Sequence, residues 1–151
     1  MDVCDLMRTD KGLLVTIRRS KTDQEAEGTI VGIPRGGQEC PVKALEAWLR
    51  AASITEGAVF RSIGRSGKVA DRRLCDRAVT VTIKRYAKRT GLDPKRFSAH
   101  SLRSGFLTSA AANGASIFKM MDVSRHKSID TLRAYVRDAE LFNDHAGAGL
   151  L

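Results

Sequence analysis

The sequence predicts an α+β fold, in which a small antiparallel β-sheet near the N-terminus is followed by a mainly helical body. Two runs rich in β-branched residues, 13–19 and 29–34, are separated by a polar segment that ends at Gly28, a pattern typical of a β-hairpin. From residue 41 onward, apolar residues recur at helical spacing between capping residues and glycines. With 151 residues, the chain is long enough to bury a core as one domain.

The hairpin comes first, and its loop places Lys21 at the tip or shoulder, projecting from the body. Pro41 then opens a helix, because proline suits the first helical position. The predicted apolar face of this helix comprises Val42, Leu45, Trp48 and Leu49.

Residues 61–73 are basic and contain glycine, and they are interpreted as a connection. A helix is predicted to begin near Asp76 and to stop near Gly91. Its apolar face is expected to bury Tyr86 as a core residue, together with Val79, Ile83 and Ala87.

Three further helices are predicted in the remainder of the chain. The first spans approximately residues 98–114 and carries His100 and Arg103. Ser116 and Ser128 are predicted to cap the two that follow.

The composition favours a nucleic-acid partner. The formal net charge is +9 and the pI is about 9.9, an excess that favours a polyanion; the alternative is a surface that is merely rich in Lys and Arg. Three scattered cysteines form neither a metal-binding pattern nor a disulfide framework, so we expect no metal and a reducing, cytoplasmic location. No apolar run approaches ~18 residues and the N-terminus lacks a signal-peptide pattern, so no membrane span is expected.

His100 and Arg103 are candidate phosphate-binding residues. They are three apart on a predicted helix and therefore project from the same face. A guanidinium binds two phosphate oxygens as a fork, and a neighbouring imidazole donates to phosphate or moves a proton. The alternative is a capping histidine beside a solvated arginine. The nearby Ser101 and Ser104 are interpreted as caps or backbone partners rather than as nucleophiles.

His126 and Tyr135 form a second candidate pair, nine residues apart. A tyrosine nucleophile needs help with deprotonation, because the pKa of a free phenol is ~10. Arg133 and Arg137 lie near Tyr135 in the sequence and are suited to stabilise a phenolate and a pentavalent phosphorus. The alternative is a core tyrosine whose hydroxyl has a hydrogen-bond partner.

Lys21 is the third candidate. An ammonium on a predicted β-turn is able to reach into a DNA groove and to protonate a leaving alkoxide. The alternative is an exposed hairpin lysine without a role.

Together these motifs resemble the catalytic domain of the tyrosine recombinases, also called phage integrases. The segment Ile17-Arg-Arg-Ser-Lys-Thr-Asp23 is similar to the family's β-hairpin lysine segment. His100-Ser-Leu-Arg103 resembles its His-x-x-Arg box, and the segment from His126 to Tyr135 resembles its last His and Tyr boxes. The resemblance covers almost the whole chain. It implies the DNA breaking-rejoining enzyme fold, with residues 1–151 as a partial catalytic domain.

The resemblance also implies a role for each residue. Tyr135 attacks the scissile phosphate and forms a 3′-phosphotyrosyl bond. Arg103 clamps the phosphate, His100 assists proton transfer or binds phosphate, and His126 hydrogen-bonds the transition state. Lys21 is the general acid for the 5′-hydroxyl leaving group. The free 5′-hydroxyl of a partner strand reverses the attack, so duplex DNA is the partner and no ATP, metal or other cofactor is needed. Further DNA contacts are expected from three arginines beside these motifs: Arg19, Arg125 and Arg133.

The sequence departs from the family pattern in two places. The family has an earlier catalytic arginine before the hairpin, but Asp2-Val-Cys-Asp-Leu already resembles the segment after it, and Arg8 is a poor substitute. We therefore expect a chain that lacks this arginine and the N-terminal DNA-clamping domain, with feeble cleavage activity. Arg125 stands where the family usually has glycine; it is expected either to contact phosphate or to face solvent.

Two other functions are compatible with these residues. One is a type IB topoisomerase, which relaxes supercoils through the same linkage; the other is a non-enzymatic, DNA-binding remnant of a decayed integrase. The C-terminal segment, residues 139–151, is expected to form a short helix and a glycine-loosened tail. It is expected either to pack on a neighbouring protomer, as in the resembled family, or to pack in cis.

Overall fold

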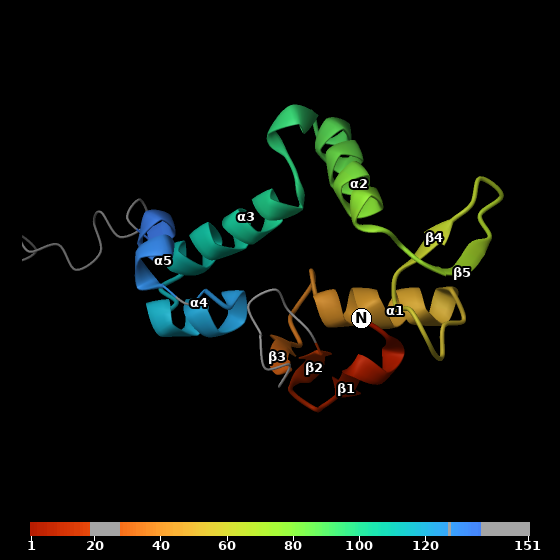
Figure 1. Ribbon diagram of the computed structural model, residues 1–151, viewed down its shortest axis with the longest axis horizontal. Helices are drawn as coiled ribbons and strands as arrows, with labels where there is room; N and C mark the ends of the chain where they lie inside the picture. Colours follow the sequence, from red (N-terminus) through yellow and green to blue (C-terminus); the bar gives the residue numbers. More distant parts are fainter. Residues whose placement is uncertain (19–27, 127, 137–151) are drawn as a thin grey trace, which may run out of the picture. The chain divides into compact units, whose positions relative to one another are not determined.

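The computed structural model describes residues 1–18, 28–126 and 128–136 (Figure 1). The chain divides into two compact units, Met1–Cys75 and Asp76–Leu151, which we call unit 1 and unit 2. The division follows the predicted order of a sheet before a helical body.

Unit 1 contains a three-stranded antiparallel sheet of order β1-β2-β3. A 3-10 turn, Val3–Asp5, leads into β1 (Leu6–Arg8), which pairs with β2 (Gly12–Ile17). The predicted pairing of the two β-branched runs is confirmed, because β2 and β3 (Thr29–Pro34) form an antiparallel ladder in which Val15 is opposite Val31. Lys21 and the rest of the predicted hairpin loop before Gly28 lie outside the described residues, as does Arg19, the last residue of the predicted first strand.

Helix α1 (Pro41–Ala51) supplies the rest of the core of unit 1. Cys40 precedes it, and the Cys40 sulfur accepts a hydrogen bond from the backbone N–H of Lys43 at 3.5 Å. The predicted apolar face is confirmed. Val42 packs with Leu13 and Val15 of β2, and Leu49 packs with Ile54 and Val59, while Leu45 and Trp48 lie at the edges of these clusters.

Residues 61–73 differ from the prediction. They form a two-stranded antiparallel sheet, β4 (Arg61–Ile63) and β5 (Val69–Arg73), so their interpretation as a mere connection was wrong. A tight turn closes the pair: the Gly64 N–H donates to the Lys68 carbonyl at 2.9 Å, and Gly67 adopts a φ of +80°. The strands are short and largely polar, so they lack the β-branched alternation that marked β2 and β3.

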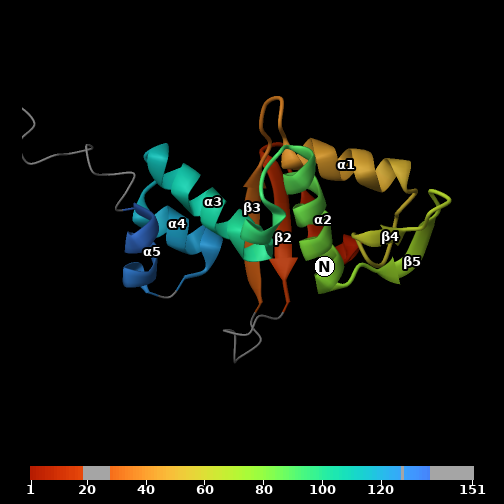
Figure 2. The same ribbon diagram turned by 90° about the horizontal axis from the view of Figure 1, so that it is seen from above.

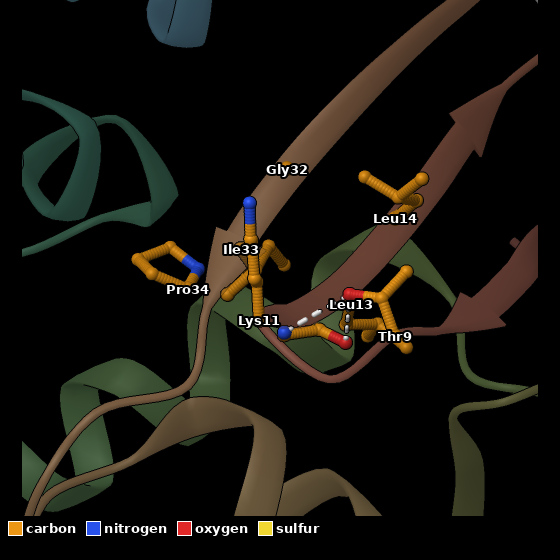
Figure 3. Close-up of a pocket in the computed structure, with 8 residues that line it drawn as sticks. Thr9, Lys11, Leu13, Leu14, Gly32, Ile33 and Pro34 are labelled. Atoms are coloured by element: carbon orange, nitrogen blue, oxygen red, sulfur yellow. Dashed lines mark hydrogen bonds between the residues drawn. The ribbon is translucent and has the colours of Figure 1, made fainter.

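A shallow hollow lies at one end of the β2–β3 pair (Figure 3). Thr9, Lys11, Leu14 and Ile33 are among the residues that line it, and the Thr9 hydroxyl bonds the backbone of Gly12 at its edge. None of the predicted site residues that the structure describes lines this hollow.

All regular elements in the described part of unit 2 are helical. Its elements are α2 (Asp76–Arg89), a 3-10 turn (Pro94–Arg96), α3 (Ala99–Ala112), α4 (Ile117–Ser124) and α5 (Ile129–Val136). Helices α3, α4 and α5 pack together, as Figure 2 shows. Their shared core consists of Leu107, Ala111, Met120 and Leu132. None of the helices in the described ranges is long and apolar enough to cross a bilayer.

The predicted helix boundaries in unit 2 are confirmed. Ser98 precedes α3, and the Ser116 hydroxyl accepts from the Lys119 N–H at 3.3 Å at the start of α4. The Ser128 hydroxyl accepts from the Asp130 N–H at 3.2 Å at the start of α5. Gly91 and Gly114, which end the first two helices of the unit, both have a positive φ.

The prediction for Tyr86 was wrong. Its side chain is 52% exposed, and the guanidinium groups of Arg85 and Arg89 lie 5.4 and 5.5 Å from the centre of its ring. Of the four residues expected on the apolar face of α2, only Ala87 is buried. Helical spacing marks a face that can be buried, but a packing partner decides whether it is.

Candidate active site

The start of α3 is held by two serines. The Ser98 N–H donates to the Ser101 hydroxyl at 3.0 Å, and the two hydroxyl oxygens lie 3.4 Å apart. Ser101 is therefore a capping partner, as predicted. This arrangement places His100 in the first turn of the helix and Arg103 one turn later, with both residues exposed.

Arg103 reaches from α3 to the end of α4. Its Nη2 donates to the Ser124 carbonyl. The same nitrogen lies 3.4 Å from Nδ1 and 3.5 Å from Nε2 of His126. A guanidinium and an imidazole that are 23 residues apart in sequence thus lie side by side.

The turn after α4 brings His126 to this position. Arg125 adopts the left-handed conformation, with φ 59° and ψ 33°, and its N–H donates to the Met121 carbonyl at 2.6 Å. The chain consequently folds back, and His126 Nδ1 lies 2.7 Å from the hydroxyl oxygen of Ser124. Glycine adopts the left-handed conformation without steric cost. Here an arginine adopts it instead.

The surroundings of His126 favour the neutral form of its imidazole. Burial lowers the pKa of His126 below its ordinary value, and the nearby positive charges of Arg103 and His100 lower it further. A neutral imidazole carries one N–H, so it donates through one ring nitrogen and accepts through the other.

Tyr135 approaches the same place from α5. Its ring centre lies 6.4 Å from that of His126, at an interplanar angle of 48°. Its hydroxyl oxygen lies 3.4 Å from the hydroxyl oxygen of Ser104, and its ring packs against the core shared by the three helices. Arg103, His126 and Tyr135 are therefore gathered by α3, the α4–α5 turn and α5.

The arginines expected to contact DNA and the candidate Lys21 are not part of this cluster as the structure describes it. Arg133 is 69% exposed and forms an ion pair with Asp130 at 3.5 Å, while Arg125 is half-buried in its turn. Arg19 and Lys21 lie outside the described residues. Among the residues that the structure describes, no group of three or more His, Cys, Asp or Glu side chains is placed to hold a metal ion.

Two serines of this site have contacts that sequence reasoning missed. Ser124 was assigned no role, and Ser104 was interpreted only as a cap or backbone partner, whereas its hydroxyl faces that of Tyr135. Neither residue belongs to a spaced motif. The only signal for Ser124 is its position two residues before His126.

The chain is similar to known proteins over most of its length. Residues 1–141 match the Phage integrase family, and the chain belongs to that family. It is 37% identical over 144 residues to an integrase/recombinase xerD homolog of Selenomonas ruminantium, covering 94% of this chain and 42% of the relative. It is 33% identical over 116 residues to a tyrosine recombinase of Synechococcus elongatus, covering 70% of this chain and 35% of the relative. The chain thus spans less than half the length of these relatives.

Two solved structures share the fold. The XerH site-specific recombinase in a post-cleavage complex with a palindromic difH substrate matches with a TM-score of 0.66 and 16% identity, over 97% of this chain and 38% of XerH. A pre-cleavage complex of XerH matches with a TM-score of 0.62 and 18% identity, over 94% of this chain and 38% of XerH. The predicted α+β fold of the family is confirmed.

Proposed function

We propose that this chain is the catalytic segment of a site-specific tyrosine recombinase, which breaks and rejoins duplex DNA through a 3′-phosphotyrosyl intermediate. One observation carries the proposal. Arg103, His126 and Tyr135 come from separate helical segments of unit 2, yet Arg103 and Tyr135 both lie close to His126. Family membership and relatives named as recombinases support it. That the solved XerH structures are complexes with a difH substrate supports duplex DNA as the partner.

In the proposed reaction, a phosphodiester bond of DNA is exchanged for a phosphotyrosyl bond, and the exchange is then reversed. The Tyr135 oxygen forms a bond to phosphorus as the bond from phosphorus to the 5′-oxygen breaks. His100 takes the phenolic proton, and Lys21 supplies a proton to the departing 5′-oxygen. A 5′-hydroxyl then attacks the phosphotyrosyl bond and releases the tyrosine, so the high-energy linkage is conserved without ATP.

Arg103 and His126 stabilise the charge that develops on phosphorus-bound oxygen in this reaction. Arg103 keeps donors beyond the one that binds the Ser124 carbonyl, since a guanidinium has five N–H groups. Such preorganised donors are worth about 10²–10³ in rate each. With Arg103 as the one arginine assigned to the phosphate, we expect cleavage by the 151-residue chain to be slow.

We also propose that residues 1–151 form the catalytic domain region of the protein, that it acts on DNA in the cytoplasm, and that the segment 139–151 links protomers on DNA. The segment lies outside the described residues, so its role rests on the resemblance alone. Deleting residues 139–151 and weighing the species formed on DNA tests this part, since unchanged assembly contradicts it.

A nicked suicide substrate tests the nucleophile, because it traps a covalent protein–DNA adduct even when cleavage is slow. Tyr135→Phe is expected to abolish the adduct. Tyr86→Phe is the matched control, because the chain has two tyrosines and Tyr86 is an exposed residue outside the site. An adduct that survives Tyr135→Phe, or that is lost in Tyr86→Phe alone, overturns the assignment.

A further inference from the structure

Ser124 is the buried polar residue of this site. It is the last residue of α4 and is 5% exposed; among the described residues only Asp5 is also both polar or charged and buried. It faces the site with two groups. Its backbone carbonyl accepts from Arg103, and its hydroxyl oxygen lies 2.7 Å from His126 Nδ1.

The contact between Ser124 and His126 joins a hydroxyl to Nδ1, and a hydroxyl is able both to donate and to accept. Arg103 Nη2 lies 3.4 Å from Nδ1 and 3.5 Å from Nε2, so the guanidinium does not distinguish the two ring nitrogens. The Ser124 hydroxyl contacts Nδ1 and therefore does distinguish them. When this hydroxyl donates, Nδ1 is the unprotonated nitrogen of the ring.

With the Ser124 hydroxyl as the donor, the single proton of the neutral ring is on the other nitrogen. A hydrogen bond at one ring nitrogen selects the tautomer at the other. The hydroxyl of Ser124 thus leaves Nε2 as the N–H of His126.

We propose that Ser124 is a positioning residue, whose hydroxyl donates to His126 Nδ1 and thereby presents the Nε2–H of His126 to the scissile phosphate. This inference rests on the proposed function of the site. The other tautomer would present the lone pair of Nε2 to an anionic oxygen, which is repulsive, and a ring turned over about its χ2 angle would place carbon atoms where the two nitrogens now lie. Ser124 therefore fixes both the tautomer and the orientation of a hydrogen-bond donor.

Three substitutions isolate the hydroxyl. Ser124→Ala removes it but keeps the carbonyl that holds Arg103. Ser124→Thr retains a hydroxyl on the same carbon and is the rescue variant. Ser116→Ala removes the hydroxyl that caps the start of the same helix, so it perturbs α4 without touching His126.

Nitrogen-15 NMR of the histidine-labelled chain tests the tautomer without DNA. The His126 signals are identified by their loss in His126→Asn. Above the pKa of the ring, we expect the proton on Nε2 in the wild type, Ser124→Thr and Ser116→Ala. In Ser124→Ala, the shifts of the two ring nitrogens are expected to move toward each other as the tautomers mix. A proton on Nδ1 in the wild type, or shifts unchanged by Ser124→Ala, overturns the inference.

Adduct formation on the suicide substrate tests the consequence. Ser124→Ala is expected to slow it by at least about 10-fold, and by less than the ~10²–10³-fold cost of losing a preorganised donor. Ser124→Thr and Ser116→Ala are expected to stay near the wild-type rate. A Ser124→Ala rate equal to wild type overturns the inference. If the wild type itself forms no adduct, the proposed function fails, and the NMR result still decides whether Ser124 sets the tautomer.

Discussion

At the residue scale, the left-handed turn at Arg125 decides where His126 lies. A side chain with a Cβ is disfavoured at φ 59°, by roughly 1–2 kcal/mol in a left-handed helix. The backbone bond to Met121 and the contact between Ser124 and His126 hold the turn despite this cost. The glycine that the family usually has at this position therefore has a conformational reason.

We expect Arg125→Gly to stabilise the protein by about 0.5–1 kcal/mol, because the left-handed conformation is free of strain for glycine. Urea denaturation measures the difference. Arg125→Ala is the control, since it removes the same charge and keeps the Cβ. Equal stability of the two variants would show that the charge, and not the backbone, matters at this position.

The lowered pKa of His126 predicts a pH dependence of stability. Between the folded pKa and the unfolded value of about 6.5, the unfolded chain binds more protons than the folded chain. The free energy of unfolding therefore holds its full value above about pH 6.5 and falls as the pH drops through the folded pKa. His126→Asn is expected to flatten this part of the profile. Parallel profiles for the two proteins, measured from pH 5 to 8, would refute this origin.

At the scale of elements, the core of α3, α4 and α5 holds the site together. Leu107, Met120 and Leu132 come one from each helix and are fully or almost fully buried. Arg103 and Ser104 lie on α3, His126 follows α4, and Tyr135 lies on α5. Packing of the three helices is therefore what brings distant parts of the sequence to one place.

Leu107→Ala is expected to cost about 2–5 kcal/mol, the usual range for a buried leucine. Leu102→Ala is the matched control on the same helix, because Leu102 is 58% exposed and Leu107 is 0% exposed. Denaturant titration of both variants makes the comparison. A loss of the same size in both would mean that this core does not stabilise the helices as proposed.

At the scale of the whole molecule, the positive charge is concentrated in unit 2. Residues 76–151 include 13 Lys and Arg against 7 Asp and Glu, whereas residues 1–75 include 13 against 10. The unit that contains Tyr135 is thus the more basic one, as an electrostatic contact with phosphates requires.

We expect weak binding of duplex DNA that falls steeply with salt and shows little sequence preference. Each phosphate contact adds about −0.9 to the slope of log Kobs against log salt concentration. Arg133→Gln is expected to reduce the magnitude of the slope by about 1. Arg35→Gln should leave it unchanged, because the Arg35 side chain is 35% exposed and donates twice to the Glu46 carboxylate, at 2.9 and 3.3 Å, whereas Arg133 is 69% exposed. Affinity that is constant between low and physiological salt would contradict an electrostatic mode.

The amino-acid sequence alone determined the β2–β3 pair, the order of the helices, several of their caps and the candidate residues. Ser98, Ser116 and Ser128 mark helix starts by local chemistry, and β2 and β3 are marked by their β-branched residues. The spacing of His100, Arg103, His126 and Tyr135 identified the candidate site, because a catalytic pattern survives as residue types at fixed intervals.

Only the tertiary structure decided which of these groups touch. The contact of Ser104 with Tyr135, the position of Ser124 between Arg103 and His126, and the exposure of Tyr86 all depend on other helices. The polar strands β4 and β5 likewise carry no strong local pattern. Caps and periodicity arise from interactions within a few residues along the chain. Contacts 21 or 31 residues apart arise from how helices pack, and nothing in the local sequence records that packing.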